Sequence, residues 1–397
     1  MVDYALKNKP AVKQALIDEE IGERDIKSAL SGWMPQISAN ADLNHSIKQQ
    51  QLSIPRNNSG ITIQADQQIL NAGLIQASKS AKYYRQQLDQ NTENKVIATT
   101  VEVSKAYYDI LTSNEQLKII SENINRLEKQ FQDAKSQYEV GLVDKTDYQR
   151  AQITLSNSKA DLKRVNELLK YKYAYLKSLI GYETDQELSL SFVGENMEQN
   201  MLLDTTDLLD YKNRVEYRLL QTQKQLQQIN TNYNKLQYMP NLSGFINYGV
   251  AYNHNNFGSL YNQSYPGSVV GLRLNIPIFQ GTKRTQEIRK SRLLEQRIDM
   301  DLKDAEYQMT SQYELAMASY KANLNDWKTA KDNIQISEEV YKTIKLQYDE
   351  GIKTYLDLMT SETDLRTAQL NYLNTLYSLL SSKIDVKQAL GTISLNQ

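Results

Sequence analysis

Side chains suited to catalysis or metal binding are few in this sequence, and their spacing supports neither role. The 397 residues include two His and no Cys, which excludes thiol catalysis, a disulfide framework and a lipid-modified Cys within this stretch. His45 and His254 fall in segments predicted to be strand or loop and match no metal-ligand spacing. The Asp and Glu pairs on the predicted helices are typical of a solvated face, and no Gly-rich phosphate-binding loop occurs. We therefore expect no enzyme, no cofactor and no metal site.

Charge and hydropathy exclude further classes of function. The net charge is −1, so the chain has no basic field that would hold nucleic acid. The mean hydropathy of −0.61 indicates little apolar area for a thick globular core. No run of about 18 apolar residues is present, and no transmembrane helix is predicted.

The beginning of the chain carries no targeting signal. Residues Met1-Val2-Asp3-Tyr4 lead directly into an amphipathic helix, without the basic and apolar lead of a signal peptide. Taken alone, this beginning would indicate a cytoplasmic protein. The strands favour instead a start that was trimmed or misassigned, with the signal peptide removed.

The sequence repeats itself over a very long period. Met34-Pro35-Gln36 returns as Met239-Pro240-Asn241, and Tyr138-Glu139-Val140-Gly141-Leu142 returns as Tyr348-Asp349-Glu350-Gly351-Ile352. The solenoid repeats of ordinary size span about 20–50 residues, so this pattern indicates duplication of a whole architectural unit. We expect the two copies of the unit to play equivalent structural roles around a symmetry axis.

Four segments alternate apolar and polar residues, which is typical of half-buried strands. They run near 36–47, 59–70, 241–252 and 268–279. The apolar sets are Ile37, Ala39, Ala41, Leu43 and Ile47; Ile61, Ile63, Ala65 and Ile69; Leu242, Ile246, Tyr248, Val250 and Tyr252; and Val270, Leu272, Leu274, Ile276 and Ile278. Each strand is about ten residues long, the length that a tilted strand needs to cross a bilayer.

Two arrangements could bury these apolar faces. A soluble sheet packed on a helix is the more common one, but the partner helices are too polar to cover it. Lipid on one face and a water-filled lumen on the other suits the alternation better. Four strands cannot close a barrel, because small closed barrels need about eight, so several chains must pool their strands.

Long helices follow each pair of strands. No Pro occurs from Leu74 to Val140, and at about 1.5 Å per residue such a helix spans roughly 100 Å. The stretch from Thr282 to Glu350 matches it. Apolar seams step by three and four residues, as in coiled coils, through Leu117, Ile120, Ile124, Leu127, Phe131, Ala134 and Tyr138, and through Trp327, Ala330, Ile334, Ser337, Tyr341, Ile344 and Tyr348.

These signals divide the chain into two repeats. The first, 1–181, has a lead-in helix, strands near 36–47 and 59–70, and long helices near 74–140 and 146–180. The second, 207–397, has a helix near 207–238, strands near 241–252 and 268–279, and long helices near 282–350 and 354–390. The segment 182–206 breaks the helical pattern between them.

A duplicated unit of this kind resembles the TolC-like outer-membrane factor family over essentially the whole chain. The most specific marks are Asp3-Tyr4-Ala5-Leu6-Lys7-Asn8-Lys9-Pro10, Trp33-Met34-Pro35-Gln36-Ile37, Ile276-Pro277-Ile278-Phe279-Gln280-Gly281 and the turns Val140-Gly141-Leu142-Val143 and Glu350-Gly351-Ile352-Lys353. The resemblance implies a homotrimer in the Gram-negative outer membrane, with a lipid-facing barrel of about twelve strands and a helical tunnel through the periplasm. It implies an exit duct for tripartite efflux or type I secretion, fed by an inner-membrane transporter and a periplasmic adaptor, with 182–206 as its equatorial segment.

The resemblance also assigns site residues at the two helix turns. Adaptor docking carries over to Gly141, Leu142, Val143, Gly351 and Ile352, although tight turns need Gly for conformation alone. The latch that closes the tunnel carries over to Thr146, Asp147, Tyr348 and Lys353, where the best-known member has Arg in place of Lys353. The constriction carries over to Asp357 and Thr360, and Thr360 departs from the acidic residue of that member. A soluble coiled-coil scaffold with a small packed sheet is the alternative.

Overall fold

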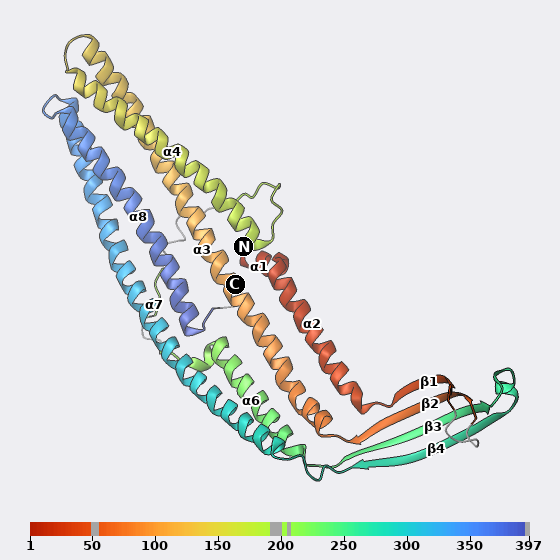
Figure 1. Ribbon diagram of the computed structural model, residues 1–397. Helices are drawn as coiled ribbons and strands as arrows, with labels where there is room; N and C mark the ends of the chain where they lie inside the picture. Colours follow the sequence, from red (N-terminus) through yellow and green to blue (C-terminus); the bar gives the residue numbers. More distant parts are fainter. Residues whose placement is uncertain (49–54, 191–200, 205–207, 394–397) are drawn as a thin grey trace. The chain divides into compact units, whose positions relative to one another are not determined.

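The computed structural model describes residues 1–48, 55–190, 201–204 and 208–393, and it forms two compact units. The first comprises Met1–Leu16, Asn91–Arg218 and Asp304–Gln397, and the second comprises Ile17–Gln90 and Leu219–Lys303. The helices of the described chain are α1 (Val2–Asn8), α2 (Pro10–Leu30), α3 (Ala72–Glu139), α4 (Lys145–Ile180), α6 (Val215–Leu236), α7 (Lys283–Asp349) and α8 (Tyr355–Leu390) (Figure 1). The strands are β1 (Gln36–His45), β2 (Asn57–Leu70), β3 (Asn241–His254) and β4 (Ser264–Asn275).

The second unit contains one antiparallel sheet in the order β1-β2-β3-β4. Ile37 pairs with Ala65, Ala65 with Ile246, and Ile246 with Val270, so these four side chains form one row across the sheet. Residues directly opposite one another on antiparallel strands point to the same face. This register confirms the apolar face predicted from the alternation of each strand.

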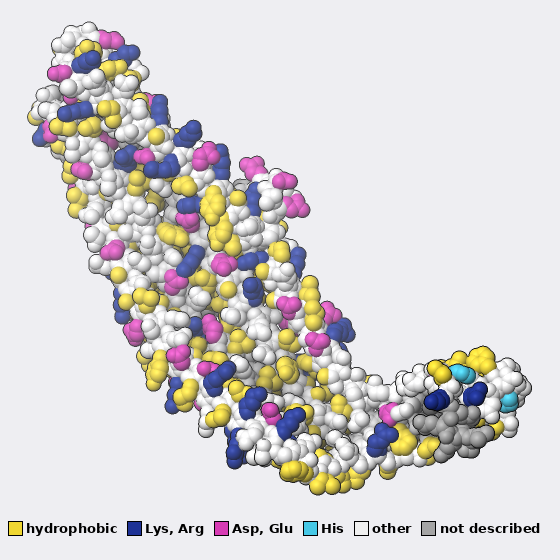
Figure 2. Space-filling view, viewed as in Figure 1, with side chains coloured by type: hydrophobic (Ala, Val, Ile, Leu, Met, Phe, Trp, Pro, Cys, Tyr) yellow, Lys and Arg dark blue, Asp and Glu magenta, His cyan; other side chains and the backbone are white. Residues whose placement is uncertain are grey.

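That apolar face is exposed in the single chain. Ile37 is 73% exposed, Ile246 59% and Val270 77%, and hydrophobic side chains are visible on the surface of the strands (Figure 2). The helices of this unit join the sheet at its end and do not cross its faces (Figure 1). A contiguous exposed apolar face is typical of a surface that another molecule or a membrane covers.

In the described ranges, no helix combines enough length with enough apolar character to span a bilayer. Lys, Arg, Asp and Glu side chains are scattered along them on the face that Figure 2 shows.

Several element boundaries differ from the predictions. β2 and β4 begin earlier than predicted, at Asn57 and Ser264, and a 3₁₀ helix, Phe257–Asn262, lies between β3 and β4. The helix predicted near 207 begins at Val215, because Asp210 caps a 3₁₀ turn, Tyr211–Asn213, and Arg214 is extended. Residues 49–54, 191–200 and 205–207 lie outside the described residues, so much of the predicted equatorial segment does too.

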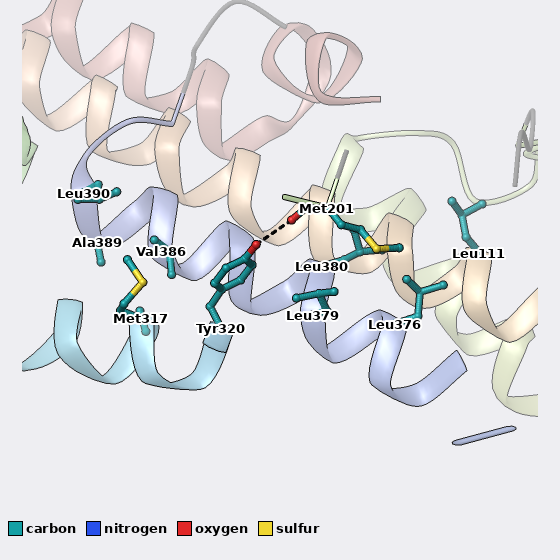
Figure 3. Close-up of a cluster of buried hydrophobic side chains, with 11 residues drawn as sticks. Leu111, Met201, Met317, Tyr320, Leu376, Leu379, Leu380, Val386, Ala389 and Leu390 are labelled. Atoms are coloured by element: carbon teal, nitrogen blue, oxygen red, sulfur yellow. Dashed lines mark hydrogen bonds between the residues drawn. The ribbon is translucent and has the colours of Figure 1, made fainter. Parts of the chain in front are cut away.

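The first unit contains two helical hairpins, α3 with α4 and α7 with α8 (Figure 1). Its core is a series of narrow clusters along the helices, as the thin seams predicted. Tyr320 is fully buried in the largest cluster, and its hydroxyl donates a hydrogen bond to the carbonyl oxygen of Met201 at 3.0 Å (Figure 3). Ile120, Ile124 and Leu127 of the predicted seam are buried in another cluster. The fold is mostly α with one sheet, as predicted.

Candidate functional site

The two hairpin turns have the same backbone geometry. Gly141 and Gly351 have φ angles of 78° and 75°, a region that L side chains rarely adopt. The next residue in each turn donates its backbone N–H back to the helix, Leu142 to Gln137 and Ile352 to Gln347, both at 2.8 Å. A Cβ on either glycine would meet nothing within 4 Å. Backbone conformation, and not space, therefore requires glycine here.

The side chains that follow the glycines form an apolar surface at the end of the hairpins. Leu142 is 76% exposed and Ile352 is 72% exposed, while Val143 is half-buried. Large apolar side chains exposed at a tight turn contribute little to folding. They are available for contact with another molecule.

Both return helices begin with a side-chain cap. The carboxylate of Asp144 accepts a hydrogen bond from the backbone N–H of Thr146 at 3.0 Å. Thr354 and Asp357 form a reciprocal capping box at the start of α8. The hydrogen bonds from the Thr354 hydroxyl and backbone, with a further contribution from the charge of Lys353, hold the pKa of Asp357 below its ordinary value. Asp357 thus has a structural role besides the constriction role implied by the resemblance.

The four predicted latch residues lie at the hairpin end. Thr146 and Lys353 are exposed, and Asp147 and Tyr348 are half-buried. Burial raises the pKa of Tyr348, and the negative charges of Asp133 and Asp147 raise it further. Asp147 of one hairpin therefore lies near Tyr348 of the other. Within the described part of the chain, Lys353 and Asp147 form no ion pair.

The predicted constriction pair lies on α8, one turn apart. Asp357 is half-buried, and Thr360 is exposed. The Thr360 hydroxyl donates to the carbonyl oxygen of Leu356 at 2.8 Å. The Thr360 hydroxyl is neutral, so Asp357 alone contributes a negative charge from this pair.

An aromatic cluster beneath the turns was not predicted. Tyr355 is 6% exposed and packs edge-on against Tyr348, with ring centroids 6.2 Å apart. Tyr148 stacks on Tyr138 at 5.9 Å and on Phe131 at 5.5 Å. The predicted seams include Phe131, Tyr138 and Tyr348, but they do not cover the first residues of α4 and α8. Tyr148 lies at the start of α4, and Tyr355 lies at the start of α8.

Sequence reasoning also missed a buried carboxylate. Glu362 on α8 is 2% exposed and accepts hydrogen bonds from three side chains of α3. Asp and Glu pairs on the predicted helices are typical of a solvated face, so the sequence gives no reason to expect a buried one. The only available signal was that Asn123, Arg126 and Gln130 recur at spacings of three and four residues, as an apolar seam does.

The two histidines lie in the sheet. His45 and His254 flank Asn57 in one row of the sheet, and Nδ1 of His45 lies 2.7 Å from the Asn57 side-chain oxygen. Across the residues that the structure describes, no group of three or more His, Cys, Asp or Glu is placed to hold a metal ion.

Comparison with protein families identifies one family over most of the chain. The family model described as outer membrane efflux protein matches residues 1–182 and 214–392. The chain is 20% identical to Outer membrane protein TolC of Vibrio cholerae over 99% of its length and 90% of that protein. It is also 20% identical to Outer membrane protein TolC of Escherichia coli, covering 98% of the chain and 80% of that protein.

Solved structures share the fold. The CmeC outer membrane channel of Campylobacter jejuni superposes with a TM-score of 0.80 at 15% identity, over 100% of this chain and 86% of that one. VceC, an outer membrane protein of Vibrio cholerae, superposes with a TM-score of 0.79 at 15% identity, over 98% and 95%. At this identity the likeness establishes the fold alone.

Proposed function

Because the chain belongs to the outer membrane efflux protein family, we propose that it is an outer-membrane exit duct that conducts substrates passively out of the periplasm. The observation that carries this proposal is the uncovered apolar face of the sheet in a chain of otherwise polar helices. Lipid of the outer membrane covers such a face. The curated relatives are named as outer membrane and efflux pump proteins, and we propose no catalytic activity for this chain.

Three copies of the chain share one barrel in this proposal. The four strands run β1-β2-β3-β4, and β1 and β4 each have one unpaired edge within the described residues. Four strands are too few to close, since small barrels need about eight, whereas a homotrimer supplies about twelve. Pairing β4 of one copy with β1 of the next removes every open edge.

The hairpin turns face the partners of the duct. Leu142, Val143 and Ile352, held by Gly141 and Gly351, are the docking surface for a periplasmic adaptor. An inner-membrane transporter supplies the energy, and the duct itself conducts passively. The exposed apolar turns support this assignment.

A latch and a constriction at the same end regulate passage. Lys353 and Tyr348 of one hairpin engage Thr146 and Asp147 of the other in the closed trimer. Lys353 and Asp147 form no ion pair within the described part of a single chain, which supports a contact between chains. Asp357 provides one ring of carboxylates, and the hydroxyl of Thr360 replaces a second ring.

Fractionation and conductance test the proposal against a soluble coiled-coil scaffold. The full-length precursor, expressed in a Gram-negative host, is expected in the outer membrane and to form channels in planar bilayers after detergent extraction. A soluble monomer that forms no channel would support the scaffold and reject the duct.

A further inference from the structure

A polar node around a buried carboxylate joins the two hairpins of the first unit, away from their turns. Its members are Asn123, Arg126 and Gln130 of α3, Ser158 of α4, and Glu362 and Arg366 of α8. We call these six residues the Glu362 node. We propose that the node is a fixed pivot that confines the opening movement to the hairpin ends beyond it. This inference rests on the proposed gating at those ends.

The carboxylate of Glu362 is the centre of the node. It accepts hydrogen bonds from Nδ2 of Asn123 at 3.0 Å, Nε of Arg126 at 2.9 Å and Nε2 of Gln130 at 2.6 Å. All three donors lie on one face of α3, because they are spaced three and four residues apart. A buried carboxylate is tolerated only where donors satisfy it. The sequence of α3 supplies three such donors opposite one glutamate.

The same network continues into the other helices. The Ser158 hydroxyl of α4 donates to Oδ1 of Asn123 at 3.4 Å and accepts from Nη1 of Arg366 at 3.0 Å. The guanidinium of Arg126 lies 5.9 Å from the ring centroid of Tyr341 on α7. Every long helix of the two hairpins therefore contacts the node.

This arrangement fixes how α8 lies along α3. A slide of one helical turn is about 5.4 Å, which would carry Glu362 away from all three donors. The buried carboxylate of Glu362 and the buried amide of Asn123 would then lose these partners, which is a severe penalty. At this level α8 and α3 can move together, but they cannot shear past one another.

The contacts nearer the turns place no such restriction on movement. Ala134, Ala151 and Tyr355 are buried there, with Tyr348 and Met359 packed against them. The Tyr355 hydroxyl is buried and has no hydrogen-bond partner within the described residues. Apolar and aromatic packing is not directional, so the hairpins can slide here without breaking a buried ion pair. The end of α8 from Tyr355 to Glu362 is only about 10 Å long, which limits the moving part.

Two substitutions of Glu362 separate the node from ordinary packing. Glu362→Gln keeps an oxygen for Asn123 and Arg126, and its amide can donate to Oε1 of Gln130, which is buried without a partner in the described chain. Glu362→Ala removes the acceptor altogether. Both variants remove the negative charge of Glu362. They differ in whether the side chain can still form hydrogen bonds.

Hydrogen–deuterium exchange of the full-length trimer in detergent tests the pivot without reference to conduction. Amides of residues 119–130 and 358–366 are expected to exchange more slowly than those of 134–139 and 344–349. Glu362→Ala should accelerate exchange at the node by roughly tenfold, and Glu362→Gln should leave it near the wild-type rate. Equal rates at node and turns, or no effect of Glu362→Ala, would overturn the inference. Should Glu362→Ala fail to assemble, Asn123→Ala removes one donor and serves the same comparison.

A covalent bridge provides the second measurement. The chain has no Cys, so Ser158→Cys with Arg366→Cys can be joined by a short bifunctional thiol reagent at the node alone. The bridged channel is expected to conduct and open as the unbridged protein does. Loss of opening on bridging would show that the node separates, and would overturn the pivot. A protein that forms no channel before bridging would instead reject the proposed duct.

Discussion

A Cβ atom on Gly181 would lie 2.5 Å from the carbonyl oxygen of Asn8. The end of α4 therefore packs directly against the backbone that leads from α1 into α2. The second half of the chain repeats this contact, because a Cβ on Gly391 would lie 2.6 Å from the carbonyl oxygen of Asn213. The duplication thus extends to individual atomic contacts.

The first prediction concerns these joints. Gly181→Ala and Gly391→Ala should each lower the temperature of unfolding, because the new methyl group overlaps backbone atoms that cannot move aside. Gly141→Ala is the matched control, since Gly141 has a similar positive φ but no atom within 4 Å of the added Cβ. The joint variants should cost roughly 1–3 kcal/mol more than the control. Equal melting temperatures for all three variants would contradict the contact.

The second prediction concerns the latch. Lys353→Ala combined with Asp147→Ala should raise single-channel conductance in planar bilayers, because the closed trimer loses contacts between hairpins. A single exposed pair is worth only ~0–1 kcal/mol, but threefold symmetry repeats it. The control is Lys345→Ala, which removes a lysine paired with Asp349 on its own helix. Unchanged conductance in the double variant would reject the latch assignment.

The third prediction concerns docking. Leu142→Asp combined with Ile352→Asp should abolish efflux while trimers still assemble, because both side chains are exposed and charge disrupts an apolar interface. Leu142→Met with Ile352→Met keeps the surface apolar and should retain efflux. Efflux by whole cells and trimer content of their outer membranes are the two measurements. Full efflux by the Asp variant would place adaptor docking elsewhere.

The fourth prediction concerns acid stability at the start of α8. Hydrogen bonds from Thr354 hold the pKa of Asp357 below its ordinary value. This carboxylate therefore contributes stability above the unfolded pKa of about 3.9, and the contribution is lost as the pH falls through the lower folded pKa. The melting temperature of Asp357→Asn should fall less steeply with pH in this range than that of the wild type. Asp364→Asn, at an exposed position of α8, is the control and should follow the wild-type profile.

Features with a strong local signal were predictable from the sequence. Strict alternation located four strands and their apolar faces, and Gly141 and Gly351 located the hairpin turns. The boundaries were less accurate where capping decides them, as at Val215, where Asp210 and an extended Arg214 delay the helix. The helical periodicity of a sequence does not show which residue caps the helix and therefore where the helix begins.

The Glu362 node was not predictable in the same way. An isolated sequence shows Asn123, Arg126 and Glu362 only as polar residues on long helices, a pattern that usually indicates a solvated face. The burial of Asn123 and Glu362 depends on two hairpins meeting, with partners separated by more than 200 positions. Tyr355 was missed for a related reason, because its burial comes from the opposite hairpin and not from a periodic seam.

The central claim is that three chains complete one barrel by pairing β4 of one copy with β1 of the next. The Cys-free sequence allows a direct test with Asn40→Cys in β1 and one cysteine at a time from residues 267–273 in β4. Within one chain these strands are separated by two others, roughly 14 Å, which is too far for a disulfide. Oxidation in outer membranes should give covalent dimers and trimers on denaturing gels for at least one pair. Monomers alone for every pair would contradict the shared barrel.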